Sequence, residues 1–355
     1  MTIYFDARFI RIDHHDGISR FSAGLFSALQ KKTELIAIVS DPRQLEKLPP
    51  CKSVLLNDPT KASELFIAFN LNRLGAQQVF SPMQTMGSLG RKYRLVLTLH
   101  DLIYYRHPAP PPSFSPLIRA VWRLYHLVYW PQRLLLNRAD AVATVSETTK
   151  KLMLEHRLTK RPISVVYNAA EQIDGEFLPK QRPKGQQTLV YMGSFMDYKN
   201  VETLISGMAD LPGYELLLLS RVAPQRKAEL ESGISKTGGS VQFLNGVSDE
   251  EYAKLIESSV ALVHASQDEG FGIPLVESMA RGVPVVVSDI DIFKEIGGDA
   301  ATYFDQNSGA DFAMKVKQLE DDFAWATKSK ASLEQAKKFS WNNSAEALLK
   351  IFSSK

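Results

Sequence analysis

The stretch from His264 to Asp289, HASQDEGFGIPLVESMARGVPVVVSD, constrains the fold of this chain more than any other. It predicts a glycine-rich loop, a short helix, a tight turn and a buried strand in direct succession. Pro274 suits the first helical position, where a missing N–H is no loss, and Gly282 suits the helix stop. The β-branched run 283–287 is typical of a strand covered on both faces. Such a unit indicates an α/β fold with a parallel sheet.

The glycine-rich loop also predicts an anion site. Free N–H groups and the positive end of the helix dipole favour phosphate, and Gly270 and Gly272 carry no Cβ that would hold a ligand away. Glu277, about one turn inside the helix, would repel that phosphate. We therefore expect it to bind ribose hydroxyls, as an acid does in dinucleotide folds. Glu269 then faces whatever is attached beyond the phosphates. The alternative is an ordinary helix start with two solvated glutamates.

The segment E-G-F-G-I-P-L-V-E, followed by GVPVV-SD, resembles the E-x₇-E signature of glycosyltransferase family 4. The segment LVYMGSFMDYKN (189–200) resembles the family's strand-G-x₅-K-N element, although Ser194 and Tyr198 stand where many members have a second basic residue. The loop within 241–259 lies by the nucleotide base in the family, and Ser220 stands where glycine is frequent. This resemblance covers nearly the whole chain. It implies a GT-B fold, with two Rossmann-like, doubly wound parallel-sheet domains facing a cleft.

The domain boundaries follow from length, apolar runs and the resemblance together. A chain of 355 residues is long for one core. Apolar runs at 3–5, 35–40, 77–82, 94–101, 141–146 and 163–168 predict strands that alternate with helices. The polar segment 169–187 is the predicted linker, and further strands follow at 189, 215, 241, 260 and 283. We expect an acceptor-binding domain at 1–168, joined by the final helix 340–355, and a donor-binding domain at 188–339.

The predicted site combines the glycine loop with positions carried over from the resemblance. The catalytic residues implied are His100, Asp101, Lys199 and Glu269. The donor contacts implied are Gly17, Gly193, Ser194, Lys199, Val247, Glu269, Gly270, Phe271, Gly272, Ile273, Pro274, Leu275 and Glu277. The acceptor contacts implied are Gly17, Ile18 and Arg20. No metal or other cofactor is implied. His14, His15 and Asp16 lack a third cluster for a metal site, and the D-x-D at 289–291 is interpreted as structural.

Charge is distributed unevenly along the chain. Residues 1–170 hold 23 Lys and Arg against 12 Asp and Glu, whereas residues 171–355 hold 19 against 27. Residues 113–138 contain four arginines, five aromatic residues and no acid. That segment suits an anionic membrane surface. The interpretation that we favour is a core helix with its aromatic side chains packed inward and its arginines in solvent. An acidic second half and the lack of a recognition motif argue against nucleic-acid binding.

The function expected is retaining, metal-independent transfer of a hexose from a nucleoside diphosphate sugar. With no obvious covalent nucleophile, front-face attack by the acceptor is implied. Details of the first half (DAR, GISRF, HD) favour GDP-mannose as donor and a glycan or lipid-linked acceptor in cell-envelope synthesis. UDP-glucose and UDP-N-acetylglucosamine stay open as donors, as do a nucleotide-sugar epimerase or hydrolase and a non-catalytic binding module. One cysteine and a charged N-terminus predict a cytoplasmic protein, or one on the inner face of the membrane.

Overall fold

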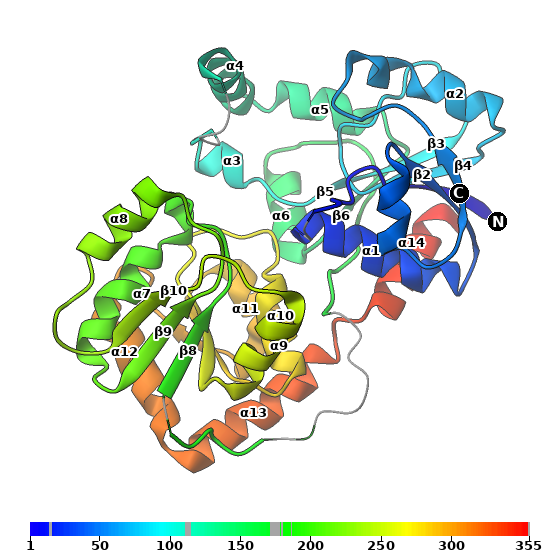
Figure 1. Cartoon of the computed structure of the whole chain (residues 1–355). Coiled ribbons are helices and arrows are strands. Elements are labelled where there is room, and N and C mark those ends of the chain that lie inside the picture. The colour runs from blue at the N-terminus through cyan, green and yellow to red at the C-terminus, as the bar shows by residue number, and fades with distance from the viewer. Residues whose placement is uncertain (14–15, 111–114, 171–177, 179, 186, 354–355) are drawn as a thin grey trace. The chain divides into compact units, whose positions relative to one another are not determined.

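The computed structural model describes residues 1–13, 16–110, 115–170, 178, 180–185 and 187–353 (Figure 1). The chain forms two compact units. One comprises Met1–Ala169 together with Ser340–Lys355, and the other comprises Ala170–Phe339. Each unit is built on its own parallel sheet.

The described part of the first unit contains a seven-stranded sheet with the order β3-β2-β1-β4-β5-β6-β7. The strands are β1 (Thr2–Asp6), β2 (Glu34–Val39), β3 (Lys52–Leu55), β4 (Gln78–Ser81), β5 (Arg94–Leu99), β6 (Ala141–Thr144) and β7 (Ile163–Val165). Every pair of neighbouring strands is parallel. The order reverses direction between β1 and β4, which is the type of position where doubly wound sheets bind ligands.

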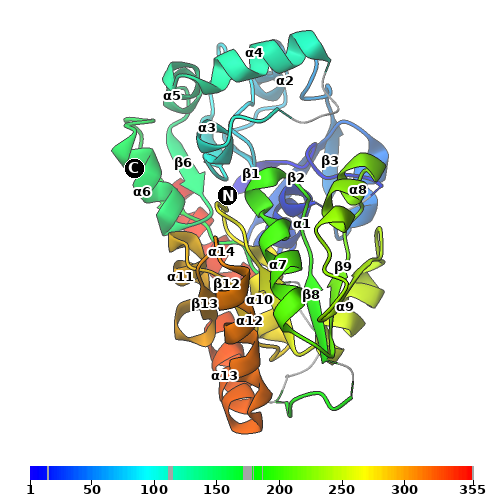
Figure 2. The same ribbon diagram turned by 90° about the vertical axis from the view of Figure 1, so that its left-hand side faces the viewer.

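Helices and short 3₁₀ turns connect these strands. They are α1 (Gly17–Gln30), η1 (Pro42–Lys47), η2 (Ala62–Phe66), α2 (Ile67–Arg73), α3 (Ile103–Arg106), α4 (Pro116–His126), α5 (Trp130–Asn137), α6 (Glu147–Glu155) and the C-terminal α14 (Trp341–Ser353). Figures 1 and 2 show α14, in red, beside α1. A Cβ on Gly24 would lie 2.3 Å from Cε2 of Trp341, so this glycine lets the indole ring lie directly on α1. The last helix is therefore part of the core of the first unit.

The described part of the second unit contains a six-stranded parallel sheet with the order β10-β9-β8-β11-β12-β13. The strands are β8 (Gln187–Tyr191), β9 (Tyr214–Leu218), β10 (Ser240–Phe243), β11 (Ala261–His264), β12 (Val285–Ser288) and β13 (Thr302–Phe304). The order reverses between β8 and β11. Because β8 and β11 are parallel neighbours, the residues that follow them meet at the carboxyl edge of the sheet.

The helices of the second unit complete its core. They are η3 (Asp197–Lys199), α7 (Val201–Gly207), η4 (Met208–Asp210), α8 (Pro224–Ser232), α9 (Asp249–Ser258), α10 (Ile273–Ala280), α11 (Asp291–Gly297), η5 (Gly298–Ala300), α12 (Gly309–Lys317), η6 (Gln318–Glu320) and α13 (Asp322–Ala336). In this core α7 packs on α12, and α10 packs on α13. The fully buried Trp325 donates its indole N–H to the carbonyl of Val260 at 2.8 Å, which fixes α13 at the start of β11.

The α/β fold with two doubly wound parallel sheets is confirmed, but several element boundaries differ from the prediction. Strand β3 was missed because its residues are mostly exposed and only its end is apolar. Strand β13 was missed because polar residues follow its three residues directly, whereas the equally short β7 continues into apolar Val166 and Tyr167 in the sequence. Pro274 is the second residue of α10 rather than the first, and β12 begins two residues after Val283. The last residue of the predicted linker, Gln187, already belongs to β8.

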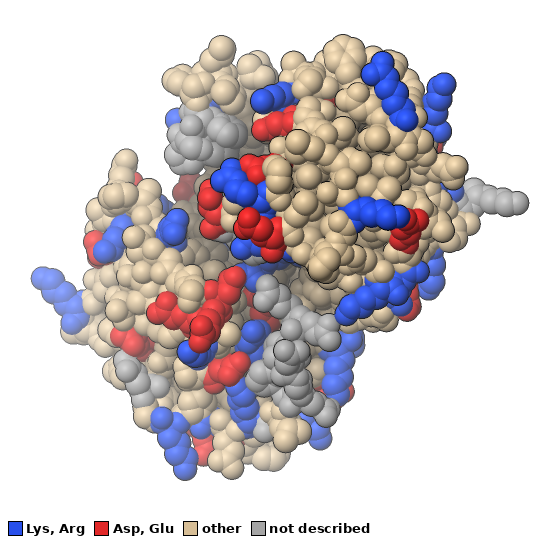
Figure 3. Space-filling view, turned by 45° about the vertical axis from the view of Figure 1, so that its right-hand side comes forward, with Lys and Arg blue, Asp and Glu red and all other residues tan. Residues whose placement is uncertain are grey.

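Basic and acidic side chains often lie next to one another on the surface. Lys52 pairs with Glu34 at 2.6 Å, and Lys32 pairs with Glu346 at 2.9 Å. The face in Figure 3 shows both signs of charge close together. The pair of Lys32 and Glu346 brings an acid from the second half of the sequence to the basic first half.

Candidate functional site

The glycine-rich loop of the second unit lies between β11 and α10, at the edge of the sheet where the strand order reverses. Gly272 forms the N-cap of α10 with a φ of +96°, a conformation that disfavours residues with a Cβ. A Cβ there would also lie 3.1 Å from the ring of Phe293. Gly272 has no side chain with which to cap the helix. Pro274 has no N–H, and the N–H of Leu275 donates to the carbonyl of Gly272 at 3.0 Å. The start of α10 therefore offers an anion the backbone N–H of Ile273 and the positive end of the helix dipole.

Lys199 and Glu269 form an ion pair beside this loop. Their Nζ and Oε1 atoms are 2.5 Å apart, and Ser266 donates its hydroxyl to the same carboxylate oxygen at 2.8 Å. Burial raises the pKa of the Glu269 carboxyl, but the Lys199 charge and these hydrogen bonds outweigh burial and hold the pKa below its ordinary value. Glu269 is thus a carboxylate at neutral pH and a poor proton donor.

Two tight loops hold Lys199 in this position. Lys199 ends η3, and Asn200 follows it in the left-handed region, with a φ of 51°. The carbonyl of Tyr198 accepts the N–H of Gln267 at 2.8 Å, which ties this loop to the loop carrying Glu269. The two charged residues are 70 positions apart in the sequence, and the neighbouring strands β8 and β11 bring them together.

Glu277 lies inside α10 and is 3% exposed. Its carboxylate accepts a hydrogen bond of 2.8 Å from the hydroxyl of Tyr252, which lies on α9. The alternative interpretation of a solvated glutamate is therefore wrong for Glu277. The carboxylate is held on the side of α10 that faces α9.

The remaining predicted donor contacts divide into two kinds. The side chains of Phe271 and Leu275 are buried, and the ring of Phe271 packs on Phe339 with centroids 5.6 Å apart. Only their backbone groups can therefore meet a ligand without rearrangement. Gly193, Ser194, Gly270, Ile273, Pro274 and Val247 are at least partly accessible.

Gly193 follows β8 at a position that has no room for a side chain. A Cβ at this position would lie 2.8 Å from the hydroxyl of Tyr191 and 3.3 Å from the ring of His264. Its N–H donates to the hydroxyl of Ser220 at 3.1 Å. Ser220, which stands where the family often has glycine, therefore fixes the turn after β8.

His100 and Asp101 lie in the first unit, directly after β5. The Nε2 atom of His100 is 2.8 Å from the carbonyl of Pro82, and its ring packs edge-on against Phe21 of α1. Burial lowers the pKa of His100 to about 4, so the ring is neutral at pH 7. Since a carbonyl only accepts, Nε2 carries the proton and Nδ1 is left as an acceptor. Asp101 accepts the N–H of Ile103 at 3.0 Å.

The predicted acceptor residues Gly17, Ile18 and Arg20 form the first turn of α1. Asp16 is the N-cap of this helix and accepts the N–H of Ser19 at 2.9 Å. Asp16 therefore caps α1, and this role explains the presence of an acid here without invoking a metal. His14 and His15 lie outside the described residues. Among the residues described, no group of three or more His, Cys, Asp or Glu is placed to hold a metal ion.

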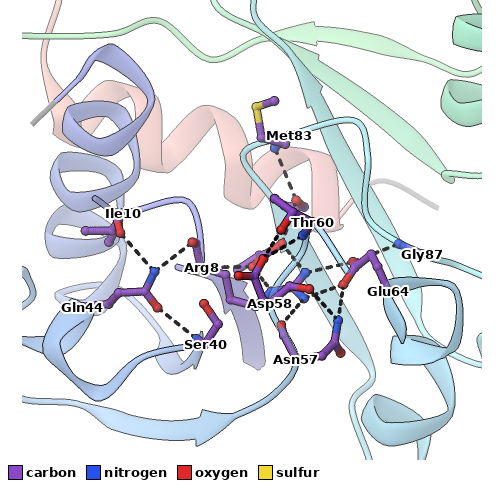
Figure 4. A network of polar contacts seen from close by, with 12 residues as sticks. Arg8, Ile10, Ser40, Gln44, Asn57, Asp58, Thr60, Glu64, Met83 and Gly87 are labelled. Atoms are coloured by element: carbon purple, nitrogen blue, oxygen red, sulfur yellow. Dashed lines mark hydrogen bonds and ion pairs between the residues drawn. The ribbon is translucent and has the colours of Figure 1, made fainter. Parts of the chain in front are cut away.

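The sequence alone did not reveal a buried ionic network at the carboxyl end of β1 (Figure 4). The Arg8 guanidinium bonds Asp6 at 2.7 Å and Glu64 at 2.6 Å, and all three residues are buried. Asp6 also accepts from the hydroxyl of Ser81 at 3.0 Å, and Glu64 accepts the N–H of Gly87 at 3.1 Å. This network joins β1, β4 and two loops on the edge of the sheet that carries the predicted acceptor residues.

Comparison with known proteins identifies the class. Two family models match: "Glycosyltransferase Family 4" over residues 31–171 and "Glycosyl transferases group 1" over residues 174–339. The sucrose-phosphate synthase of Thermosynechococcus elongatus superposes with a TM-score of 0.73 at 17% identity, covering 99% of this chain and 98% of that one. The molecule thus has the GT-B glycosyltransferase fold. The chain belongs to glycosyltransferase family 4.

Two bacterial relatives share part of the sequence. The O-antigen chain mannosyltransferase RfbU of Salmonella typhimurium is 29% identical over 234 residues, which cover 63% of this chain and 60% of the relative. The O-antigen chain mannosyltransferase B of Escherichia coli is 26% identical over 273 residues, or 71% of this chain and 68% of the relative. The match therefore spans less than two thirds of the length of RfbU.

Proposed function

We propose that this protein is a retaining, metal-independent mannosyltransferase. It transfers mannose from GDP-mannose to a glycan or lipid-linked acceptor in cell-envelope polysaccharide or glycolipid synthesis. The observation that carries the proposal is the Lys199–Glu269 pair beside the uncapped start of α10. The names of the two O-antigen mannosyltransferases support mannose as the sugar.

The chemistry follows from the charges at this site. Departure of the nucleotide puts negative charge on the diphosphate, which fixed positive groups stabilise. Lys199, the backbone N–H of Ile273 and the positive end of the α10 dipole supply that positive potential. Glu269 stays ionised because its pKa is depressed, so it suits a sugar hydroxyl or the positive charge that develops at the anomeric carbon. Glu277 holds the ribose. The acceptor attacks on the front face, which retains the anomeric configuration.

Binding of nucleotides is the first test. A ligand that binds only the folded state raises the melting temperature by mass action. We expect GDP to stabilise the protein more than UDP or ADP do, with and without EDTA, and Glu277→Gln and Lys199→Ala to lose that effect. If no nucleotide shifts the melting curve, the protein is a degenerate GT-B scaffold and the proposal fails.

Turnover of GDP-mannose separates the transferase from the other classes. Release of GDP that requires an added mannose-terminated glycan, with retained configuration by NMR and no effect of EDTA, is the result expected. Release of GDP without an acceptor would instead identify a hydrolase, and conversion of GDP-mannose into an isomeric nucleotide sugar would identify an epimerase. Binding without turnover would favour a non-catalytic module. UDP-glucose and UDP-N-acetylglucosamine are the donors to compare.

We also propose that α4 contacts an anionic membrane, where a lipid-linked acceptor would be found. None of the α4 residues is buried. Its exposed apolar face consists of Leu117, Ile118, Val121 and Leu124, with Leu127 following, and these are 52–75% exposed. The aromatic side packs inward, since Trp122 lies against Tyr104 at 4.8 Å between ring centroids. The prediction that this segment is a core helix is thus wrong for its aliphatic face, which is exposed.

Charge supports a lipid partner for this face. Arg119 and Arg123 lie on α4, and α5 adds Arg133 within a segment that contains no acid from 113 to 138. Phe114 of that segment lies outside the described residues. At 3.6 residues per turn, Arg119 and Arg123 lie on the side of α4 opposite the aliphatic face. A helix with an apolar face and an arginine-bearing polar face suits the interface of an anionic membrane. Among the described residues, no helix has the length and hydrophobicity needed to cross a membrane.

Co-sedimentation with liposomes tests this contact. We expect binding to vesicles containing anionic lipid, weaker binding to neutral vesicles, and loss of binding in Val121→Ser/Leu124→Ser. Binding that ignores anionic lipid, or that survives Arg119→Glu/Arg123→Glu, would contradict the proposal. Self-association through this face would appear instead as a concentration-dependent mass in light scattering without vesicles.

A further inference from the structure

The loop after β9 and the loop after β10 come together at the carboxyl edge of the second sheet. The carbonyl of Leu219 accepts the N–H of Gly246 at 2.8 Å, and the side chain of Asn245 accepts the N–H of Val222 at 3.2 Å. Asn245 and Gly246 both have positive φ values, 56° and 108°. These bonds fix residues 219–222 against residues 245–246.

Arg221 lies across this junction. A Cβ built on Gly246 would lie 3.0 Å from Cγ and 3.2 Å from Nε of Arg221, so the arginine stem passes directly over the glycine. Arg221 as a whole residue is exposed. Within the described part of the chain, no hydrogen bond or ion pair engages it. The structure therefore holds the stem of Arg221 in place and leaves its donors open to a ligand.

The ribose position assigned to Glu277 connects this junction to the nucleotide. Glu277 accepts from Tyr252, which lies in the first turns of α9. Helix α9 begins at Asp249, three residues after Gly246. The diphosphate is assigned to the start of α10 and the sugar to Glu269. The base, on the opposite side of the ribose, therefore extends towards the loop under Arg221.

We propose that Arg221 reads the base of the donor and selects guanine. This inference rests on the proposed nucleotide-sugar activity. Guanine presents two neighbouring acceptors, O6 and N7, which match the two parallel N–H donors of a guanidinium. Uracil lacks that pair, and adenine replaces O6 with an amino group. Arg221 thereby determines specificity without taking part in the chemical step.

Calorimetric titration of GDP, UDP, ADP and 7-deaza-GDP tests this role. We expect the native protein to prefer GDP, and Arg221→Ala to weaken GDP about tenfold to a hundredfold, the range for one bidentate contact. UDP binding should change little. Since 7-deaza-GDP lacks the N7 acceptor, it should bind the native protein more weakly than GDP, and Arg221→Ala should no longer distinguish the two.

Two variants serve as controls. Arg221→Lys keeps the charge but loses the planar pair of donors, so it should lose most of the preference for GDP. Lys236→Ala removes an exposed charge from the loop that precedes β10, at the opposite edge of the sheet, and should leave all four affinities unchanged.

The possible outcomes separate the two proposals. Equal losses for GDP and UDP in Arg221→Ala would show a non-selective contact and overturn the inference. A native preference for UDP or ADP would overturn it together with GDP-mannose as the donor, while leaving a nucleotide-sugar enzyme intact. Failure of the native protein to bind any nucleotide would overturn the proposed function itself.

Discussion

Replacing Arg8 with methionine should strongly destabilise the first unit. The Arg8 side chain is fully buried and bonds two carboxylates, those of Asp6 and Glu64. Burial lowers the pKa of Arg8, but both carboxylates outweigh burial and raise it, so the guanidinium is charged at every accessible pH. Arg8→Met keeps a similar length of apolar stem but leaves two buried carboxylates without their counter-ion (Figure 4).

The magnitude follows from that loss of a partner. Removing one member of a buried ion pair costs about 3–5 kcal/mol, because the remaining charge stays desolvated. For a unit of this size, each kcal/mol lowers the melting temperature by about 2–4 °C, so a decrease of roughly 6–20 °C is expected. The triple variant Asp6→Asn/Arg8→Met/Glu64→Gln removes the unpaired charges as well and should recover part of the loss.

Hydrogen exchange with mass spectrometry is the suitable assay, since a chain of two units need not unfold in one step. Peptides from β1 and β4 report on the first unit, and peptides from β8 and β9 serve as the internal reference. Arg43→Met is the matched control, because Arg43 pairs with Asp41 at 2.6 Å on the surface, where ion pairs contribute little. A loss below about 1 kcal/mol in Arg8→Met, or an equal loss in β8 and β9, would refute the reasoning.

Two further predictions concern the second unit. Gly272→Ala should cost about 1–3 kcal/mol, because alanine is strained at a φ of +96° and its Cβ would approach Phe293; a denaturation midpoint equal to the native one would contradict this. Burial lowers the pKa of His264 to about 4, so between about pH 6.5 and 4 the unfolded state binds the proton that the folded state excludes, and stability falls as the pH decreases. His264→Phe should therefore flatten the pH dependence of the unfolding free energy in that window, which a series of melting curves at fixed ionic strength would measure.

Local sequence patterns were enough to predict most of the fold. The alternation of short β-branched runs with helical periodicity predicted the class. Pro274 marked the start of α10 to within one residue, and Gly282 marked its end. Strand β3 was not predicted, because an exposed strand at the edge of a sheet needs few apolar residues. Lys199 and Glu269 meet at one edge of the second sheet, because the parallel neighbours β8 and β11 end on the same side.

The sequence by itself determined which residues could carry chemistry, since the glycine loop, the paired glutamates and the lysine are local patterns. Only the tertiary structure decided what each side chain contacts. The bonds between Arg8 and Glu64, Lys199 and Glu269, and Tyr252 and Glu277 depend on strand order and helix packing. The same reason explains why the exposure of α4 was not predicted. An amphipathic pattern predicts a helix with an apolar face, but whether other residues cover that face depends on how the rest of the chain is arranged.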